Sequence, residues 1–318
     1  MTKQKTSPLV SVVIPIYNEQ ESLPTLFSRL YPSMDALQRP YEIVFVDDGS
    51  ADRSAAMLRE QFDRHPEVTR VVLLQSNFGQ HAAILAGFSE ARGEIVVTLD
   101  ADLQNPPEEI GTLLEKMDQG YDYVGTIRRK RQDVWWRTYA SRLMNRLRER
   151  ITKVKMTDQG CMLRAYARHV VDAINSTSEI NTFIPALAYL YSLRPTEVVV
   201  EHNEREAGES KYSLYKLIRL NFDLVTGFSV VPIQMFSFFG VIIAGGSFLM
   251  FIVLVGYRLI NPAGSVEGVF TLFAIVFFFI GILLFGIGLL GEYVGRIYQE
   301  VQRRPRFLIR AILEKKNK

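Results

Sequence analysis

Short apolar runs alternate with longer amphipathic stretches over residues 9 to about 127. The runs VSVVIPI, YEIVFVDD, TRVVLLQS, EIVVTLD and YDYVGTI have the length and composition of strands, and intervening stretches such as GQHAAILAGFSEA have helical spacing. Nearly continuous apolar strands that alternate with helices are typical of a parallel sheet covered on both faces. The pattern therefore predicts an α/β domain with a mostly parallel sheet.

Two long uncharged segments, at about 232–257 and 268–291, follow this domain. A helix needs about 20 apolar residues to cross the hydrocarbon core of a bilayer, so both segments are long enough. A pair of buried core helices is the alternative, although soluble cores rarely contain such long runs without charge. The segments therefore predict two transmembrane helices.

The basic residues predict how these helices are oriented. The loop between the two segments, RLINPAGSVE, holds one Arg and one Glu, whereas the tail after Gly291 and the region before the first segment are rich in Arg and Lys. Regions rich in Arg and Lys stay on the cytoplasmic side of a membrane. We therefore expect a multi-pass protein of the cytoplasmic membrane with both termini in the cytoplasm.

These patterns divide the chain into a cytoplasmic domain over residues 1–230, two transmembrane helices within 231–292 and a basic cytoplasmic tail over 293–318. Within the first domain, the segments at about 135–155 and 211–228 are amphipathic and basic. Helices of this kind lie in a membrane interface, and the alternative is a pair of ordinary surface helices packed on the domain. We interpret both segments as interface helices.

Composition narrows the class further. The chain has 318 residues, a formal net charge of +3 and a single cysteine, Cys161. One cysteine excludes an intramolecular disulfide framework and suits a reducing compartment. The mild net charge gives no reason to expect a nucleic-acid partner. The first apolar run ends in Tyr-Asn-Glu without a cleavage site for a signal peptide, so we interpret it as the first strand.

Polar residues follow each predicted strand at its carboxyl end. In open parallel sheets, ligands bind outside the carboxyl ends of the strands. The polar groups at that edge are Tyr17, Asn18 and Glu19 after the first strand, Asp47 to Ser50 after the second, Asn77 to Gln80 after the third, Asp100 and Asp102 after the fourth, and Arg128 after the fifth. Their shared position predicts a binding site at this edge.

Asp100 and Asp102 indicate what that site binds. In a strand, residues i and i+2 point to the same face, so the two carboxylates converge. Two like charges about 4 Å apart repel by roughly 4 kcal/mol at an effective dielectric constant near 20, and a cation beside them removes this cost. Mg²⁺ binds few protein carboxylates and keeps positions for substrate phosphates, and Mn²⁺ also suits oxygen ligands.

A metal with open positions at a strand edge predicts a nucleoside diphosphate as the ligand. The chain contains no P-loop and no G-x-G-x-x-G motif, so the metal would hold the diphosphate, helped by Arg128. Asp48 can accept a hydrogen bond from a base N–H, and Glu19 can accept one from the ribose or the base. His81 and His169 fall within helical patterns, and we interpret them as structural.

Four motifs together resemble one enzyme family. The stretches VVIPIYNE, VDDGS, LDADLQNPPE and LLGEYVGRIY are similar to those of the inverting GT-A glycosyltransferases that charge polyprenyl phosphates, the dolichol-phosphate-mannose-synthase-like group. NFGQHAAILAGF, DQGCMLRAY and GESKYS resemble most closely the bacterial members that transfer 4-deoxy-4-formamido-L-arabinose to undecaprenyl phosphate. The resemblance covers nearly the whole chain and implies a GT-A (Rossmann-like) domain in a bacterial inner membrane.

The resemblance also implies roles for individual residues. Those expected to bind the nucleotide are Pro15, Tyr17, Glu19, Asp48, Asp100, Ala101, Asp102 and Arg128. The metal ligands are expected to be Asp102 and Asp100. The basic residues expected to meet the lipid phosphate are Arg205, Lys211 and Arg137. The catalytic residues are expected to be Asp158, as the proposed base, and Asp102.

The position of the proposed catalytic base departs from the family pattern. Some relatives carry the acid directly before a Phe-Arg pair, whereas this chain reads DQGCMLRAY, which leaves Cys161 as an alternative to Asp158. A phosphate monoester has its second pKa near 6, so the acceptor is largely an unprotonated nucleophile at cytoplasmic pH. Asp158 is therefore expected to orient the acceptor more than to deprotonate it, and Cys161 is otherwise expected to be a small packed residue.

The implied reaction transfers the sugar, with inversion, from a UDP-sugar to undecaprenyl phosphate for lipid A modification and polymyxin resistance. UDP-glucose or another hexose as donor, for O-antigen or other glycans, is the alternative within the same chemistry. A processive polysaccharide synthase would carry a Q-x-x-R-W motif, which the chain lacks. A non-catalytic partner of a lipid flippase is the alternative of another class. Relatives form tetramers, so we expect a homo-oligomer.

Overall fold

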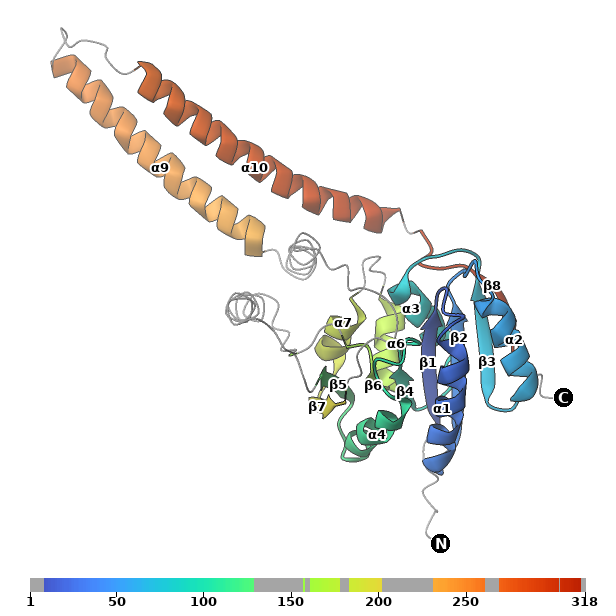
Figure 1. Ribbon diagram of the computed structural model, residues 1–318. Coiled ribbons are helices and arrows are strands. Elements are labelled where there is room, and N and C mark those ends of the chain that lie inside the picture. The colour runs from blue at the N-terminus through green and yellow to red at the C-terminus, as the bar shows by residue number, and fades with distance from the viewer. Residues whose placement is uncertain are drawn as a thin grey trace. The chain divides into compact units, whose positions relative to one another are not determined.

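The computed structural model describes residues 9–128, 157, 161–177, 183–201, 231–260, 269–302 and 304–315 (Figure 1). The chain divides into two compact units. One contains the sheet and its covering helices, and the other contains a pair of long apolar helices. The predicted interface helices at about 135–155 and 211–228 lie outside the described residues.

The first unit is built on one mixed sheet. Within the described residues its strand order is β7-β5-β6-β4-β1-β2-β3-β8. The strands are β1 (Val10–Ile16), β2 (Tyr41–Asp47), β3 (Thr69–Leu74), β4 (Ile95–Thr98), β5 (Tyr123–Arg128), β6 (Arg164–Ala167), β7 (Pro195–Val200) and β8 (Ile309–Leu313). β6 and β8 run antiparallel to their neighbours, and the other strands are parallel. The predicted α/β class with a mostly parallel sheet is confirmed.

Helices cover both faces of this sheet (Figure 1). The helices are α1 (Leu23–Ala36), α2 (Ser54–Arg64), α3 (Gln80–Glu90), the 3₁₀ turn η1 (Pro107–Glu109), α4 (Ile110–Asp118), α6 (Arg168–Ser176) and α7 (Ile184–Tyr191). The apolar side chains of α1, α2 and α4 pack with Val12 and Ile14 of β1 in one core cluster. α3 packs on β1 and β2 from the other face and contacts α6.

α3 lies unusually close to the sheet at Gly87. A Cβ atom at this position would lie 2.3 Å from Cγ1 of Val13 and 3.1 Å from Cγ2 of Val46. Real Cβ atoms do not approach other carbons this closely, so glycine is required for the packing distance. This contact sets the distance between α3 and the sheet. The first turn of α3 lies at the edge where the parallel strands end.

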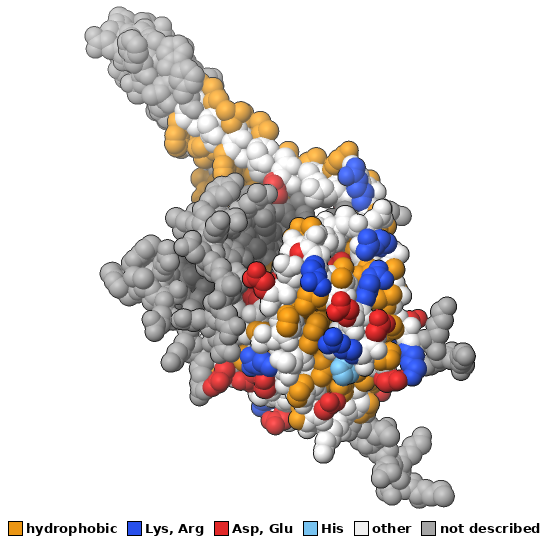
Figure 2. Space-filling view, turned by 45° about the vertical axis from the view of Figure 1, so that its right-hand side comes forward, with side chains coloured by type: hydrophobic (Ala, Val, Ile, Leu, Met, Phe, Trp, Pro, Cys, Tyr) orange, Lys and Arg blue, Asp and Glu red, His pale blue; other side chains and the backbone are white. Residues whose placement is uncertain are grey.

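The second unit consists of α9 (Val231–Ile260) and α10 (Val269–Val301). The rings of Phe236 and Phe285 lie 6.1 Å apart, and a Cβ atom at Gly286 would lie 2.1 Å from the Phe236 ring, so the two helices pack closely there. Hydrophobic side chains gather along the outside of this unit (Figure 2). Leu284 and Phe285, for example, are 62% and 67% exposed.

Both predicted apolar segments form helices. Among the described residues, one stretch of 24 residues, Phe278–Val301, is long and apolar enough to cross a membrane by length and composition. The apolar stretch of α9 that meets the composition test, Ile233–Ile243, is shorter. The helical character of both segments is therefore confirmed, whereas the crossing of a membrane by two helices stays a prediction.

Replacing Gly87 with alanine is expected to destabilise the first unit by about 1–3 kcal/mol, because the added methyl group overpacks the contact with Val13. The measurement is thermal unfolding of the full chain in detergent. Gly111→Ala in α4 is the matched control, since the nearest atom to its Cβ, Cδ2 of Leu37, lies 3.3 Å away and alanine favours a helix. Equal melting temperatures for the two variants would contradict the packing argument.

Candidate functional site

The carboxyl ends of β1, β2, β3, β4, β5 and β7 lie at one edge of the sheet, which we call the site edge. The antiparallel strand β6 begins at the same edge, at Arg164. The loops that follow β1 to β4 carry most of the predicted site residues. The prediction that these loops share one edge is therefore confirmed by the strand directions.

The loops after β1 and β2 are hydrogen-bonded to each other. Asn18 has a left-handed backbone with φ of 55°, and its N–H donates to Oγ of Ser50 at 3.0 Å. The N–H of Glu19 donates to Oγ of Ser54 at 2.9 Å. These bonds hold Glu19 at the sheet edge and leave the Tyr17 side chain accessible, with 48% of that residue exposed. An accessible aromatic ring on the same loop as a carboxylate suits a flat base and its ribose.

Asp48 anchors a third loop. Its Oδ1 and Oδ2 accept hydrogen bonds from the N–H groups of Phe78 at 2.7 Å and Gly79 at 2.8 Å. The residue is 2% exposed, and burial raises the pKa of its carboxyl group while the two backbone bonds lower it. Both carboxylate oxygens of Asp48 thus accept hydrogen bonds within the fold. Its predicted hydrogen bond to the nucleotide base stays a prediction.

Gly49 lets the second and third loops approach each other. Its φ is +68°, a conformation that side chains disfavour. A Cβ atom there would lie 2.6 Å from the carbonyl carbon of Ser76 and 2.8 Å from the backbone nitrogen of Asn77. The glycine of the VDDGS motif is therefore explained by a backbone contact between two site loops.

The acidic turn after β4 is fixed by hydrogen bonds and by an unusual backbone. Nε2 of Gln80 donates to Oδ1 of Asp100 at 2.7 Å, and the N–H of Gln104 donates to Oδ1 of Asp102 at 3.2 Å. Leu103 has a φ of +58°, which is uncommon for a residue with a side chain and is often found at functional sites. The turn is therefore held in one shape by its neighbours.

The negative charges around Asp100 favour the binding of a cation. Burial raises the pKa of Asp100 to about 7, with further increases from the negative charges of Asp102 and Glu19, and with smaller opposing effects from Gln80 and Arg164. A divalent ion would relieve this repulsion. Among the described residues, no group of three or more His, Cys, Asp or Glu side chains is placed to hold a metal. Two carboxylates with further positions filled by phosphate oxygens and water nevertheless fit Mg²⁺ or Mn²⁺.

Arg164 is a fully buried cation at the start of β6. Its Nε donates to the carbonyl oxygen of Cys161 at 2.8 Å, and its guanidinium group also donates to the hydroxyl group of Tyr123. Its charge stabilises the ionised form of Asp100. Sequence reasoning missed this residue, although an arginine at the start of an apolar strand in DQGCMLRAY is a detectable signal.

Cys161 belongs to the core. It is 1% exposed, and its Sγ donates to Oδ1 of Asn105 at 3.2 Å. The expectation of a small packed residue is confirmed, and this burial gives the thiol no access to a bound acceptor. His81 is also packed, with its ring 5.6 Å from that of Phe183, and burial lowers its pKa to about 4, helped by Arg164.

The remaining predicted residues fall into two groups. Pro15 pairs with Val46 inside the sheet, Ala101 is buried between the two acids, and Arg128 is the last residue of β5. The others lie outside the described residues: Arg137, Asp158, Arg205 and Lys211. Their predicted roles stay predictions.

The sheet order and the acidic site edge are those of a GT-A-type α/β domain. Residues 11–174 match the model of the family "Glycosyl transferase family 2", and the chain belongs to this family. The glycosyltransferase class and the resemblance carried by the motifs are thereby confirmed. Over 314 residues the chain is 52% identical to the undecaprenyl-phosphate 4-deoxy-4-formamido-L-arabinose transferase of Edwardsiella ictaluri (strain 93-146), covering 98% of this chain and 97% of that protein.

Solved structures give more distant similarities. Glucosyl-3-phosphoglycerate synthase from Mycobacterium tuberculosis, in complex with Mn²⁺, uridine diphosphate and phosphoglyceric acid, is 16% identical with a TM-score of 0.48, covering 69% of this chain and 77% of that chain. TarS 1-349 of S. aureus is 17% identical with a TM-score of 0.40, covering 63% of this chain and 58% of that chain.

Asp100→Asn is expected to stabilise the metal-free protein at pH 8 while removing its stabilisation by Mn²⁺. Because folding raises the pKa of Asp100 from 3.8 to about 7, its contribution to stability falls as the pH rises from about 4 to 7. Asparagine carries no charge and avoids this cost. The free energy of unfolding at pH 8 should therefore rise by on the order of 2 kcal/mol after allowance for solvent screening. The measurement is the melting temperature from pH 5 to 8, with EDTA or with Mn²⁺.

The control for this prediction is Asp63→Asn, at an exposed position of α2. It should leave both the pH dependence and the effect of Mn²⁺ unchanged. If the difference between Asp100→Asn and the parent protein stays constant from pH 5 to 8, folding does not raise the pKa of Asp100.

Proposed function

We propose that this protein transfers 4-deoxy-4-formamido-L-arabinose, with inversion, from a UDP-sugar to undecaprenyl phosphate. The observation that carries the proposal is the 52% identity over 98% of the chain to a protein named for this transfer. The acidic site edge supports it, because Asp100 and Asp102 lie there and carboxylate oxygens are suitable ligands for a divalent ion that holds a diphosphate. The reaction would serve lipid A modification and polymyxin resistance.

The described residues indicate how the UDP-sugar donor would be bound. Tyr17 and Glu19 border the space for the uridine, and Asp100 and Asp102 would hold Mg²⁺ or Mn²⁺. When bound, such an ion neutralises charge on the departing diphosphate. Gln80 orients the Asp100 carboxylate through its 2.7 Å hydrogen bond, so the acid is in place before the donor arrives.

The acceptor is the phosphate group of the lipid. One of its oxygens attacks the anomeric carbon from the side opposite the diphosphate, which inverts that carbon and releases UDP. Since the second pKa of a phosphate monoester lies near 6, the acceptor needs little help with deprotonation. Asp158 orients it, and Arg137, Arg205 and Lys211 neutralise its charge.

The membrane arrangement forms part of the proposal. α9 and α10 both cross the bacterial inner membrane and leave both termini in the cytoplasm, where the UDP-sugar is found. We expect residues 1–230, with the interface helices, and 293–318 to be cytoplasmic and 231–292 to lie in the membrane. The expected basic tail is not a separate part, because Ile309–Leu313 forms β8 of the sheet. The protein is a homo-oligomer, with a tetramer as the expected state.

A panel of UDP-sugars tests the proposal directly. The purified protein is incubated with undecaprenyl phosphate, Mg²⁺ or Mn²⁺, and UDP-4-deoxy-4-formamido-L-arabinose, UDP-glucose or another UDP-hexose, and the lipid-linked product is measured. We expect the formamido sugar to give the highest kcat/KM by at least about tenfold, because unmatched polar groups in a sugar pocket are costly. A preference for UDP-glucose would support the hexose alternative, and no product from any donor would overturn the transferase assignment.

Asp102→Asn is expected to slow turnover more than Asp158→Asn does. The first change removes a metal ligand, whereas the second removes a group that orients an already ionised nucleophile. We expect a loss of about 10³-fold or more for Asp102→Asn and of about 10²-fold for Asp158→Asn, measured as single-turnover rates. Asp118→Asn, which removes the ion pair between the last residue of α4 and Arg39, is the control. The reverse order would make Asp158 the base.

A further inference from the structure

His81 lies in the first turn of α3, at the site edge. It directly follows Gln80, whose Nε2 donates to Oδ1 of Asp100 at 2.7 Å. Burial lowers the pKa of His81 to about 4 and raises that of Asp100 to about 7, and the positive charge of Arg164 lowers both values. One buried guanidinium group therefore acts on both side chains, which places His81 close to the acids that would hold the diphosphate.

An aromatic neighbour holds the His81 ring in place. The centroid of this ring lies 5.6 Å from that of Phe183, and the ring planes meet at 68° in an edge-to-face contact. Phe183 is the N-cap residue of α7, so two helices far apart in the sequence fix the ring. Because its pKa is about 4, the imidazole group is neutral at neutral pH and has one N–H donor and one acceptor nitrogen.

The surroundings of the ring indicate which nitrogen carries the proton. Nδ1 of His81 is buried and has no hydrogen-bond partner among the described residues. Buried N–H groups without an acceptor are rarer in proteins than buried acceptors without a donor. We therefore expect the proton on Nε2. His81 as a whole is half-buried, which leaves part of the residue accessible.

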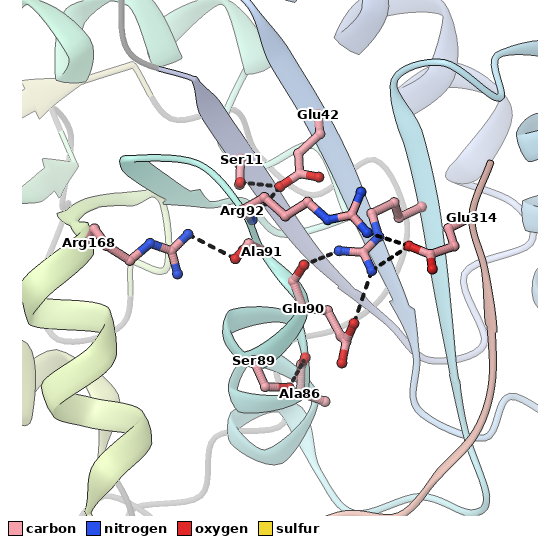
Figure 3. A network of polar contacts seen from close by, with 10 residues as sticks. Ser11, Glu42, Ala86, Ser89, Glu90, Ala91, Arg92, Arg168 and Glu314 are labelled. Atoms are coloured by element: carbon pink, nitrogen blue, oxygen red, sulfur yellow. Dashed lines mark hydrogen bonds and ion pairs between the residues drawn. The ribbon is translucent and has the colours of Figure 1, made fainter. Parts of the chain in front are cut away.

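The polar network at the opposite edge of the sheet differs from this arrangement (Figure 3). There Oγ of Ser11 donates to Oε1 of Glu42 at 2.6 Å, and Nη2 of Arg92 donates to Oε2 of Glu314 at 2.5 Å. These carboxylates are paired with donors of the chain itself, so the fold explains them without a ligand. The imidazole group of His81 has no such pairing among the described residues.

The donor sugar would lie at the same end of α3. Its anomeric carbon is bonded to the diphosphate, which Asp100 and Asp102 would hold through a metal ion. A formamido group on this sugar carries a carbonyl oxygen, which accepts hydrogen bonds. The same sugar without its formyl group carries an amine, which is largely protonated near pH 7 and then has only donors.

We infer that His81 is a specificity residue for the donor sugar, and that its Nε2–H donates a hydrogen bond to the carbonyl oxygen of a formamido group. The inference rests on the proposed function and deepens it. An ammonium group at the same place would meet an N–H donor and the positive charge of Arg164, neither of which can accept its proton. The contact therefore favours the formylated sugar over the unformylated one.

Replacing the imidazole group with a ring that has no N–H tests this inference. His81→Phe keeps an aromatic contact with Phe183. The measurement is the dissociation constant, by calorimetry with Mn²⁺ and without acceptor, of UDP, of UDP-4-deoxy-4-formamido-L-arabinose and of the same donor without its formyl group. The parent protein should bind the formylated donor more tightly than the unformylated one by at least about tenfold. His81→Phe should lose this preference because it binds the formylated donor about tenfold to hundredfold more weakly, with the affinity for UDP unchanged.

Two further variants serve as rescue and control. His81→Gln keeps an amide N–H donor and should retain most of the preference. His65→Phe is the matched control, because the His65 ring also contacts an aromatic ring, that of Tyr31 at 4.4 Å, but at the opposite edge of the sheet. It should bind all three ligands as the parent protein does. Equal weakening of both donors in His81→Phe, or an unchanged preference, would overturn the inference.

A second measurement on the parent protein applies even if His81→Phe does not fold. The nitrogen chemical shifts of the His81 ring should show a neutral ring with the proton on Nε2, and the Nε2 signal should move when the formylated donor binds. A proton on Nδ1, or a signal that does not respond to the donor, would overturn the inference. A parent protein that prefers UDP-glucose or binds no UDP-sugar would instead overturn the proposed function.

Discussion

The burial of a carboxylate beside other carboxylates, at the end of a buried strand, is the constraint on which the site depends. Burial, followed by the negative charges of Asp102 and Glu19, raises the pKa of Asp100 to about 7. A folded chain tolerates this arrangement only with compensation. Gln80 and Arg164 supply part of it, and a divalent ion bound with a diphosphate would supply the rest. The acids are therefore a preorganised site for a cation and an anion together.

The surrounding fold keeps these charges in place. Asp48 holds the loop that begins α3, and α3 carries Gln80 to Asp100. The close approach of Gly87 to Val13 sets the position of the same helix on the sheet. The acidic turn is thus held by the packing of α3 and by the hydrogen bonds that Asp100 and Asp102 accept from Gln80 and Gln104.

The sequence predicted the first five strands and the site edge because their signals are local. Each strand is a short apolar run with polar residues after it, and the direction of parallel strands then brings those residues together. β8 was not predicted, because IRAIL lies in a basic tail and pairs with β3 across more than two hundred residues. Gln80 was expected at the site edge, but its bond to Asp100 was not, and Arg164 was missed. Only the folded chain brings these two residues to Asp100. Asp48 was assigned only to binding the nucleotide base, because its hydrogen bonds to Phe78 and Gly79 cannot be predicted from sequence spacing.

The central claim is that the acids at the site edge bind a diphosphate through a divalent ion. Calorimetric titration of UDP into the metal-free protein, with and without Mn²⁺, tests this claim most directly. The account predicts tight binding of UDP with Mn²⁺, binding weaker by at least about tenfold without it, and loss of the difference in Asp102→Asn. Equal affinity for UDP in Mn²⁺ and in EDTA would contradict it.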